Sequence, residues 1–408
     1  MKYRKLTDCC EFISDGDHLP PPKSTDGIPF ITISNITGEN KISFEDTMFV
    51  PKSYYDKLSE TKKVRKGDIL YSVVGSFGKP VYVDFEMPVV FQRHIAILRP
   101  KSDVNGKFLY YTMLNPQFYR MVDKLAIGCS QRTVTLDTLR NIEVNLPDKG
   151  IQDKMVGILS LIDEKIDINN NINDNLKQQA KLLYDYWFTQ FDFPDESGKP
   201  YRSSGGKMVW NEQLKRDIPS GWKVIPFLEV ASWESNSQPP KSEFIYEPQE
   251  GYVRFIQNRD YESNTHITYI PLTKNLSIVD RFDILMDKYG DAGAVRYGIE
   301  GAFNVALGKI CVHNQNYREY IRSFLSSDGI YNFLHNSCMA STRASLNESN
   351  LAILNIPIPD EKLILGYEKI LCKMRLSILK NNDETQKLID LRDWLLPMLM
   401  NGQATIND

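Results

Sequence analysis

The sequence predicts an α+β protein made of two similar modules, each followed by a long helix. Three observations predict this fold class: a repeat, short strand-like segments between turn residues, and a heptad pattern after each module. The repeat has a spacing of 212 residues (359 minus 147) and relates Phe91 to Phe303, Leu139 to Leu351, and Pro147 to Pro359. Because a duplicated chain presents two similar surfaces, we expect a target with two parts.

Length and composition indicate a globular protein. The 408 residues suffice for two to four domains, and 42% hydrophobic with 25% charged residues is ordinary. No signal peptide is recognisable, and no apolar run reaches the roughly 18 residues of a membrane helix. The six cysteines form no C-x-x-C pair, which indicates reduced thiols and a cytoplasmic protein without a metal site.

The charge balance excludes a simple polycation that coats nucleic acid. The net charge is −3. Residues 1–150 hold 21 Lys and Arg against 18 Asp and Glu, and residues 221–360 hold 12 against 16. A DNA-binding face would therefore need basic residues concentrated locally, or a partner that supplies positive charge.

The first module, residues 1–150, combines strands with helix. Segments 28–33, 69–74 and 94–98 are rich in β-branched and aromatic residues, which favours strands. Residues 108–125 have a helical apolar stripe, and residues 141–146 alternate like a last strand before Pro147. The second module is expected at residues 221–360, after a linker at 191–220 that is rich in Pro, Gly and Ser.

A long helix is expected after each module, over residues 151–190 and 361–402. A heptad seam is predicted at Ile151, Met155, Ile158, Ile162, Ile172, Leu176 and Leu183. The second seam is predicted at Leu363, Tyr367, Ile370, Met374, Ile378, Leu388, Leu391, Leu395 and Met398. Asn169 and Asn381 recur at matching positions, which favours buried residues that fix register and pairing over polar residues merely near a seam.

Motifs for catalysis are missing from the sequence. It contains no P-loop, no dinucleotide-binding glycine fingerprint and no N/D-P-P-Y/F tetrapeptide of amino-methyltransferases. The five histidines form no i, i+4 pair, so no metal site is expected. We therefore expect a chain that catalyses nothing by itself.

The order of the motifs resembles the specificity (S) subunit of type I restriction-modification systems. The resemblance covers residues 1 to about 402. It rests on Asp68-Ile69-Leu70 before Gly75 and Gly78, and on Asp283-Ile284-Leu285 before Gly290 and Gly293. It also rests on Leu6-Thr7-Asp8-Cys9, the Gly128–Arg132 segment, Pro219-Ser220-Gly221-Trp222-Lys223, and the long helix that closes each half.

This resemblance implies a non-catalytic reader of double-stranded DNA. Each module would be a target recognition domain for one half of a split, asymmetric sequence, and the helices would pair as an antiparallel coiled-coil spacer. They would dock two modification subunits, which bind S-adenosylmethionine and methylate adenine. Restriction subunits, which use ATP and Mg²⁺, would cut the DNA, so this chain itself would bind no cofactor.

Candidate DNA contacts lie in two segments of each module. The glycine loops, with Gly75, Gly78 and Lys79 in the first module and Gly290 and Gly293 in the second, would let backbone approach DNA, although tight turns also need glycine. Gln131, Arg132 and Thr133, with Thr342 and Arg343 in the second module, would read bases, or else cap and solvate the loop. Gln suits adenine and Arg suits guanine.

Two other functions remain open from the sequence alone. A methyltransferase or nuclease with its own recognition domain would need a cofactor fingerprint or an acid–lysine site, and the sequence shows neither. A bivalent scaffold on a coiled-coil spacer would bind protein or carbohydrate without sequence-dependent DNA binding.

Overall fold

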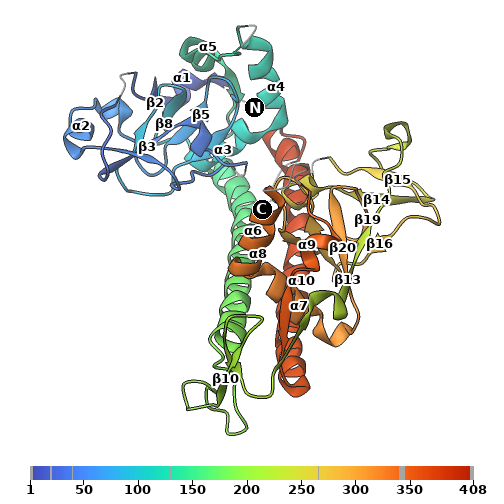
Figure 1. Cartoon of the computed structure of the whole chain (residues 1–408). Coiled ribbons are helices and arrows are strands. Elements are labelled where there is room, and N and C mark those ends of the chain that lie inside the picture. The colour runs from blue at the N-terminus through green and yellow to red at the C-terminus, as the bar shows by residue number, and fades with distance from the viewer. Residues whose placement is uncertain are drawn as a thin grey trace. The chain divides into compact units, whose positions relative to one another are not determined.

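The computed structural model describes residues 3–18, 21–38, 40–128, 131–264, 266–339 and 345–404 (Figure 1). The chain forms two compact units. Unit 1 combines Met1–Ile168 with Glu384–Asp408, and unit 2 comprises Asn169–Asp383. Each unit holds one α+β module, the first part of the helix that follows it, and the last part of the other long helix. The order of segments along the chain does not reveal this grouping.

The module of unit 1 contains two main sheets. The first sheet is antiparallel, in the order β2 (Cys10–Asp15), β8 (Ile95–Pro100), β5 (Ile69–Ser72) and β6 (Pro80–Tyr82). The second has the order β4 (Met48–Val50), β3 (Ile28–Ile31) and β7 (Val90–Phe91), with β3 and β7 parallel. A two-stranded sheet joins β1 (Tyr3–Lys5) to β9 (Glu143–Asn145).

The module of unit 2 repeats this topology with one additional strand, β16, in its second sheet. Its first sheet has the order β13 (Ala231–Ser235), β20 (Leu307–Val312), β17 (Ile284–Asp287) and β18 (Val295–Arg296). Its second has the order β15 (Tyr269–Pro271), β14 (Tyr252–Ile256), β19 (Gly301–Phe303) and β16 (Ile278–Val279), again with one parallel pair, β14 and β19. β12 (Lys223–Pro226) pairs with β21 (Asn355–Ile358) as β1 pairs with β9.

Short helices cover the main sheets. Unit 1 has α1 (Leu6–Cys9), α2 (Lys52–Asp56), α3 (Gly106–Leu114), α4 (Pro116–Leu125) and α5 (Leu136–Asn141). Unit 2 has α7 (Arg318–Ser326), α8 (Asp328–Met339) and α9 (Glu348–Leu351). The predicted single helix over 108–125 is wrong. Asn115 caps α4 by accepting a bond from the Gln117 N–H at 3.0 Å, and Pro116 cannot continue α3 because it has no N–H to donate.

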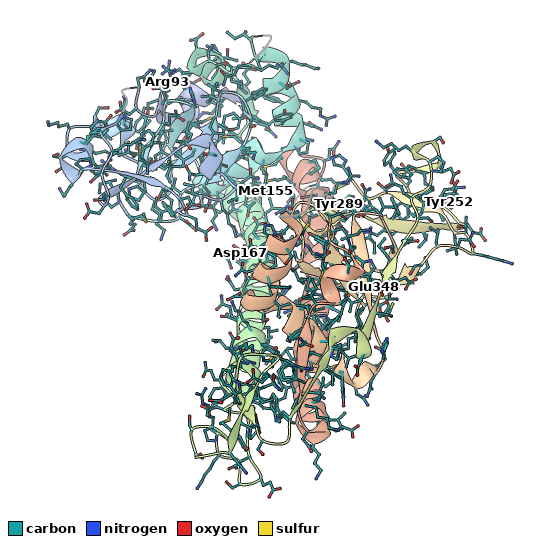
Figure 2. The ribbon with its side chains drawn as sticks, in the orientation of Figure 1. Arg93, Met155, Asp167, Tyr252, Tyr289 and Glu348 are labelled. Atoms are coloured by element: carbon teal, nitrogen blue, oxygen red, sulfur yellow. The ribbon has the colours of Figure 1, made fainter. Side chains whose placement is uncertain are left out.

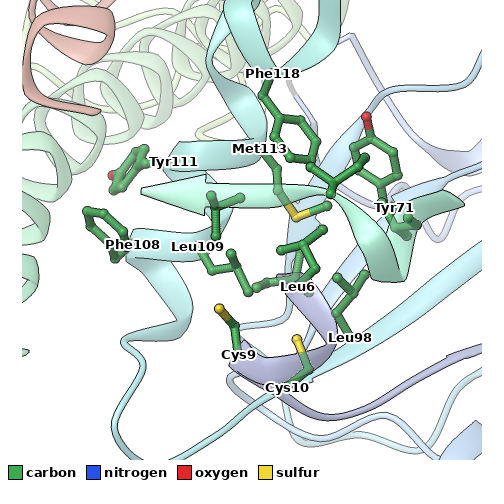
Figure 3. Packing of buried hydrophobic residues seen from close by; sticks show 14 of the residues in the cluster. Leu6, Cys9, Cys10, Tyr71, Leu98, Phe108, Leu109, Tyr111, Met113 and Phe118 are labelled. Carbon is green, nitrogen blue, oxygen red and sulfur yellow. The ribbon is translucent and has the colours of Figure 1, made fainter. Parts of the chain in front are cut away.

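The largest core of the first module lies between its first sheet, which contains β5 and β8, and the helices α3 and α4. Figure 3 shows Phe108, Leu109 and Met113 of α3 beside Leu6, Cys9 and Cys10, all of them buried. No disulfide links the described cysteines: Cys9, Cys10, Cys311, Cys338 and Cys372 are free thiols. None of the helices in the described part of the chain has the length and apolar character to cross a bilayer.

The predicted linker is an ordered structure rather than a loose connection. It contains a hairpin of β10 (Met208–Asn211) and β11 (Arg216–Pro219). Phe193 stacks on Tyr201 with ring centroids 4.7 Å apart, and its ring also lies against Trp222 at 5.4 Å. The segment therefore packs against the start of the second module through its aromatic residues, which the counts of Pro, Gly and Ser do not indicate.

The first long helix is α6 (Lys149–Tyr184). Part of its buried seam lies one residue after the predicted positions. A π-helical turn, η3 (Asp185–Thr189), continues it. Met155 and Ile162 are buried as predicted, but Ile151, Ile158 and Ile172 are exposed. The buried positions that recur at heptad spacing are Met155, Leu159, Ile162, Ile166, Asn169 and Asn173. Apolar residues occur at neighbouring positions, such as Ile158 and Leu159, so the sequence was compatible with two alternative heptad registers.

In the second long helix, α10 (Glu361–Met400), some of the predicted seam residues are buried and others are exposed. Tyr367 and Ile378 are buried, as predicted, while Ile370 and Leu391 are exposed. Buried Ile364, Leu371 and Leu396 complete its seam.

The two long helices run antiparallel and contact each other in both units (Figure 1). In unit 1, Arg392 lies 3.2 Å from the Asp163 carboxylate. In unit 2, Asn381 donates to Asn173 at 2.9 Å, and Asn173 donates to Asn382 at 2.8 Å. These contacts, with the two α+β modules, confirm the predicted fold class. Asn381 thus contacts Asn173, and Asn169 is buried on the same seam.

A cluster of buried ions joins the second module to α10. Glu319 of α7 is fully buried and pairs with both Arg322 and Arg375, the latter at 3.1 Å. The Arg375 guanidinium lies 3.8 Å from the ring centre of Tyr297. Glu368 of α10 accepts the Glu319 N–H at 2.9 Å. Burial raises the pKa of Glu368 to about 7.

In unit 1 a different polar contact lies between the module and the helices. The Tyr111 hydroxyl of α3 donates to Asp163 of α6 at 2.6 Å, and Arg392 of α10 pairs with the same carboxylate. Lys107 lies near Ser160, with its ammonium 3.4 Å from the hydroxyl oxygen. Each module is thus held to the helices by buried or half-buried polar side chains.

Asn173→Ala is expected to destabilise the chain. The change removes two amide hydrogen bonds from a buried seam position, which costs about 1–3 kcal/mol of unfolding free energy. Urea denaturation followed by circular dichroism measures the loss. Asn171→Ala, at an exposed position of the same helix, is the matched control, and equal midpoints for both variants would contradict this role of Asn173.

Glu368→Gln is expected to change how stability depends on pH. The unfolded chain ionises Glu368 near pH 4.5, whereas the folded chain keeps the proton up to about pH 7. The stability that this proton provides is therefore complete below pH 4.5 and is lost as pH rises to 7. Unfolding free energies measured from pH 5 to 8 should show Glu368→Gln gaining on the wild type by at most about 3 kcal/mol. A difference between the two proteins that does not change with pH would refute the assignment.

Candidate nucleic-acid interface

The first glycine loop connects β5 to β6 in a tightly bonded turn. The Ser72 N–H donates to the Lys79 carbonyl at 3.1 Å, and the Gly78 N–H donates to the Ser72 carbonyl at 3.0 Å. Gly75 has a φ of 68° and Gly78 a φ of 93°, in the left-handed region that favours glycine. The Lys79 N–H also donates to the Ser72 hydroxyl. The turn therefore requires glycine at both positions because of their positive φ angles.

Gly78 is also required by a close neighbour. A Cβ at this position would lie 2.5 Å from two ring carbons of Tyr119. That ring stacks on Phe77 with centroids 5.9 Å apart and is 42% exposed. An exposed aromatic side chain of α4 therefore lies beside the backbone of the loop.

The structure brings the second predicted segment of unit 1 against this loop. The Gly75 N–H donates to the Arg132 carbonyl at 3.0 Å, and Val74 and Thr133 form a bridge between the two segments. The exposed Gln131 reaches the same place, because its amide nitrogen would lie 3.7 Å from a Cβ on Gly75. Candidates separated by more than 50 residues in sequence thus form one surface.

Arg132 within this surface is already engaged. Its guanidinium bonds to the carboxylate and to the backbone carbonyl of Asp123, and lies 5.6 Å from the ring centre of Phe77. The side chain thereby ties the 131–133 segment to the end of α4. Gln131 is the more accessible of the two predicted base-reading side chains.

The second glycine loop connects β17 to β18 with the same backbone. The Asp287 N–H donates to the Ala294 carbonyl at 2.9 Å, and the Gly293 N–H donates to the Asp287 carbonyl at 2.9 Å. Gly290 and Gly293 have φ angles of 71° and 96°, within 3° of their counterparts. One further backbone bond is equivalent in the two modules. After α4 the Val134 N–H donates to the Val73 carbonyl, and after α8 the Leu346 N–H donates to the Lys288 carbonyl.

The side chains on the second loop differ from those on the first. Asp291 accepts a bond from the Tyr331 hydroxyl at 2.5 Å and lies 3.3 Å from Arg296. Arg296 also pairs with Asp287 at 2.8 Å. Burial raises the pKa of Asp287, although the contact with Arg296 acts in the opposite direction. Tyr289, labelled in Figure 2, follows β17 and has an exposed fraction of 49%.

A tyrosine that was not predicted from the sequence borders each glycine loop, whereas two predicted residues are not described. Thr342 and Arg343 lie outside the described residues, so their roles stay predictions. Tyr119 and Tyr331 were not predicted, although they occupy equivalent positions 212 residues apart and both border a glycine loop. The repeat spacing therefore carried a signal for them. Among the described residues, no group of three or more His, Cys, Asp or Glu side chains could hold a metal ion.

Comparisons with known proteins agree with this architecture. A family model described as the type I restriction modification DNA specificity domain matches residues 1–178 and 219–370, once for each module. The HindI specificity subunit of Haemophilus influenzae is 23% identical over 406 residues, which cover 84% of this chain and 87% of the relative. The MjaIX specificity subunit of Methanocaldococcus jannaschii is 23% identical over 322 residues, covering 76% and 71%.

A solved structure shares the fold. The crystal structure of a type I restriction-modification system S subunit from M. genitalium superposes with a TM-score of 0.59 at 16% identity, and the match covers 98% of this chain and 96% of that one. The family model spans most of the sequence, with one match on each module. The chain therefore belongs to the family of type I restriction-modification specificity subunits, the DNA-recognition components of these systems.

Proposed function

We propose that this chain reads a split, asymmetric DNA sequence, one half with each module, and directs adenine methylation and restriction by partner subunits. The observation that carries the proposal is the pair of glycine loops. Their backbone bonds and φ angles match between the modules, whereas their side chains differ. A constant frame with different side chains is what two readers of different half-sites require.

The long helices suit a spacer between the half-sites. α6 has 36 residues and α10 has 40, so each is about 54–60 Å long at about 1.5 Å per residue. This length corresponds to about 16–18 base-pair steps at about 3.4 Å each. In this proposal, the paired helices set the distance between the two half-sites.

The partners in this proposal are two modification subunits and the restriction subunits. S-adenosylmethionine, ATP and Mg²⁺ would bind to them, and this chain would perform no catalysis. Exposed apolar side chains on the long helices offer area for docking: Ile158, Leu161, Ile168, Ile172, Leu376, Leu391 and Trp394. Free cysteines and a DNA target support a cytoplasmic location.

Co-expression with a type I modification subunit from the same host tests the proposal. Single-molecule sequencing of the host DNA should show methyladenine at one split motif, and this methylation should disappear when the chain is omitted. A stable complex that methylates no motif would contradict the proposal, and would favour a scaffold.

Gly78→Ala is expected to weaken recognition of one half-site. The new Cβ meets Tyr119 and the φ is strained for alanine, so the loop must shift. We expect the rate of methylation of the split motif to fall about tenfold. Gly150→Ala, on α6 with no other atom within 4 Å of a Cβ, is the control and should methylate at the wild-type rate. Equal rates for both variants, with equal thermal stability, would remove the loop from the interface.

A further inference from the structure

The two glycine loops carry side chains of different chemistry at one pair of equivalent positions, Ser76 and Asp291. Each is the residue after the first glycine of its loop, Gly75 or Gly290. Because the loop backbones match, any difference in recognition between these positions arises from the side chains. The first module presents a hydroxyl, which both donates and accepts, and the second presents a carboxylate, which only accepts.

The Asp291 carboxylate is held firmly while half of the side chain stays exposed. Its exposed fraction is 50%. The Tyr331 hydroxyl donates to Oδ1 at 2.5 Å, and the Arg296 guanidinium lies 3.3 Å from Oδ2. Arg296 is anchored in turn by the buried carboxylate of Asp287. Donors from β18 and α8 thus fix the direction of an acceptor at the loop surface.

A carboxylate has about four acceptor sites, so the bonds to Tyr331 and Arg296 leave the exposed part of the Asp291 carboxylate free to accept from a base. In the major groove, the amino groups of cytosine and adenine are the hydrogen-bond donors. The adenine amino group lies between two acceptors, adenine N7 and thymine O4, which repel a carboxylate, whereas the cytosine amino group has one adjacent acceptor, guanine O6. A fixed carboxylate therefore favours cytosine over adenine.

We propose that Asp291 reads a cytosine in the half-site bound by the second module. Tyr331 and Arg296 act as positioning residues that orient the carboxylate. This assignment rests on the proposed function, because it requires that the glycine loops face DNA.

Asp291→Asn gives the sharpest test, because an amide pairs with adenine N6 and N7 where a carboxylate does not. The complex with the modification subunit is incubated with duplexes carrying C, A, G or T at each position of one half-site, and methyladenine is measured. The wild type should prefer one C·G pair, and the variant should shift toward A·T at that position. The expected change in the C-to-A preference is about 5- to 140-fold.

Three comparisons separate a base contact from other effects. Glu250→Gln removes one negative charge from an exposed loop of the same module, and should leave the preference unchanged. Tyr331→Phe keeps the carboxylate but removes its hydroxyl donor, and should reduce the preference without reversing it. The base preferences at the positions of the other half-site should stay normal in all variants, which shows that the complex is folded.

Two results would overturn the assignment while leaving the proposed function intact. One is a second-module half-site without a C·G pair, and the other is an Asp291→Asn preference identical to that of Glu250→Gln. A wild-type complex that methylates no split motif would overturn the proposed function, and the assignment of Asp291 with it.

Discussion

The pairing of α6 with α10 is the constraint on which the rest of the structure depends. Each helix has a buried seam that no single module could cover along its whole length, so each is stable in the presence of the other. The contacts keep one antiparallel register: ten residues after Asp163, Asn173 contacts Asn382, ten residues before Arg392. Because the helices follow different modules, this register brings segments from both ends of the sequence into unit 1.

The sequence predicted the duplicated fold better than the details of its helices. The spacing of 212 residues is a property of the chain itself, and the equivalent sheets follow from it. The phase of the α6 seam depended on choosing between neighbours such as Ile158 and Leu159, which hydrophobicity alone does not separate. Burial of Asn173 depends on its partners 208 and 209 residues away, which no local pattern reveals.

The candidate site was predictable in its backbone and less so in its side chains. Gly75 and Gly78 stand where positive φ angles and a close ring demand glycine, so their spacing was informative. The engagement of Arg132 with Asp123 was not predictable, because whether an arginine is free depends on the tertiary position of α4. For the same reason, only the folded chain shows that Tyr331 and Arg296 meet at Asp291.

The polar contacts that attach the modules carry opposite charges at equivalent positions. Lys107 and Asp163 in the first half correspond to Glu319 and Arg375 in the second. A recombination event that moved only the second module onto the first helix would bring Glu319 toward Asp163, two carboxylates in a partly buried place. A module therefore avoids this clash when the helix that follows it moves with it as far as Asp163 or Arg375.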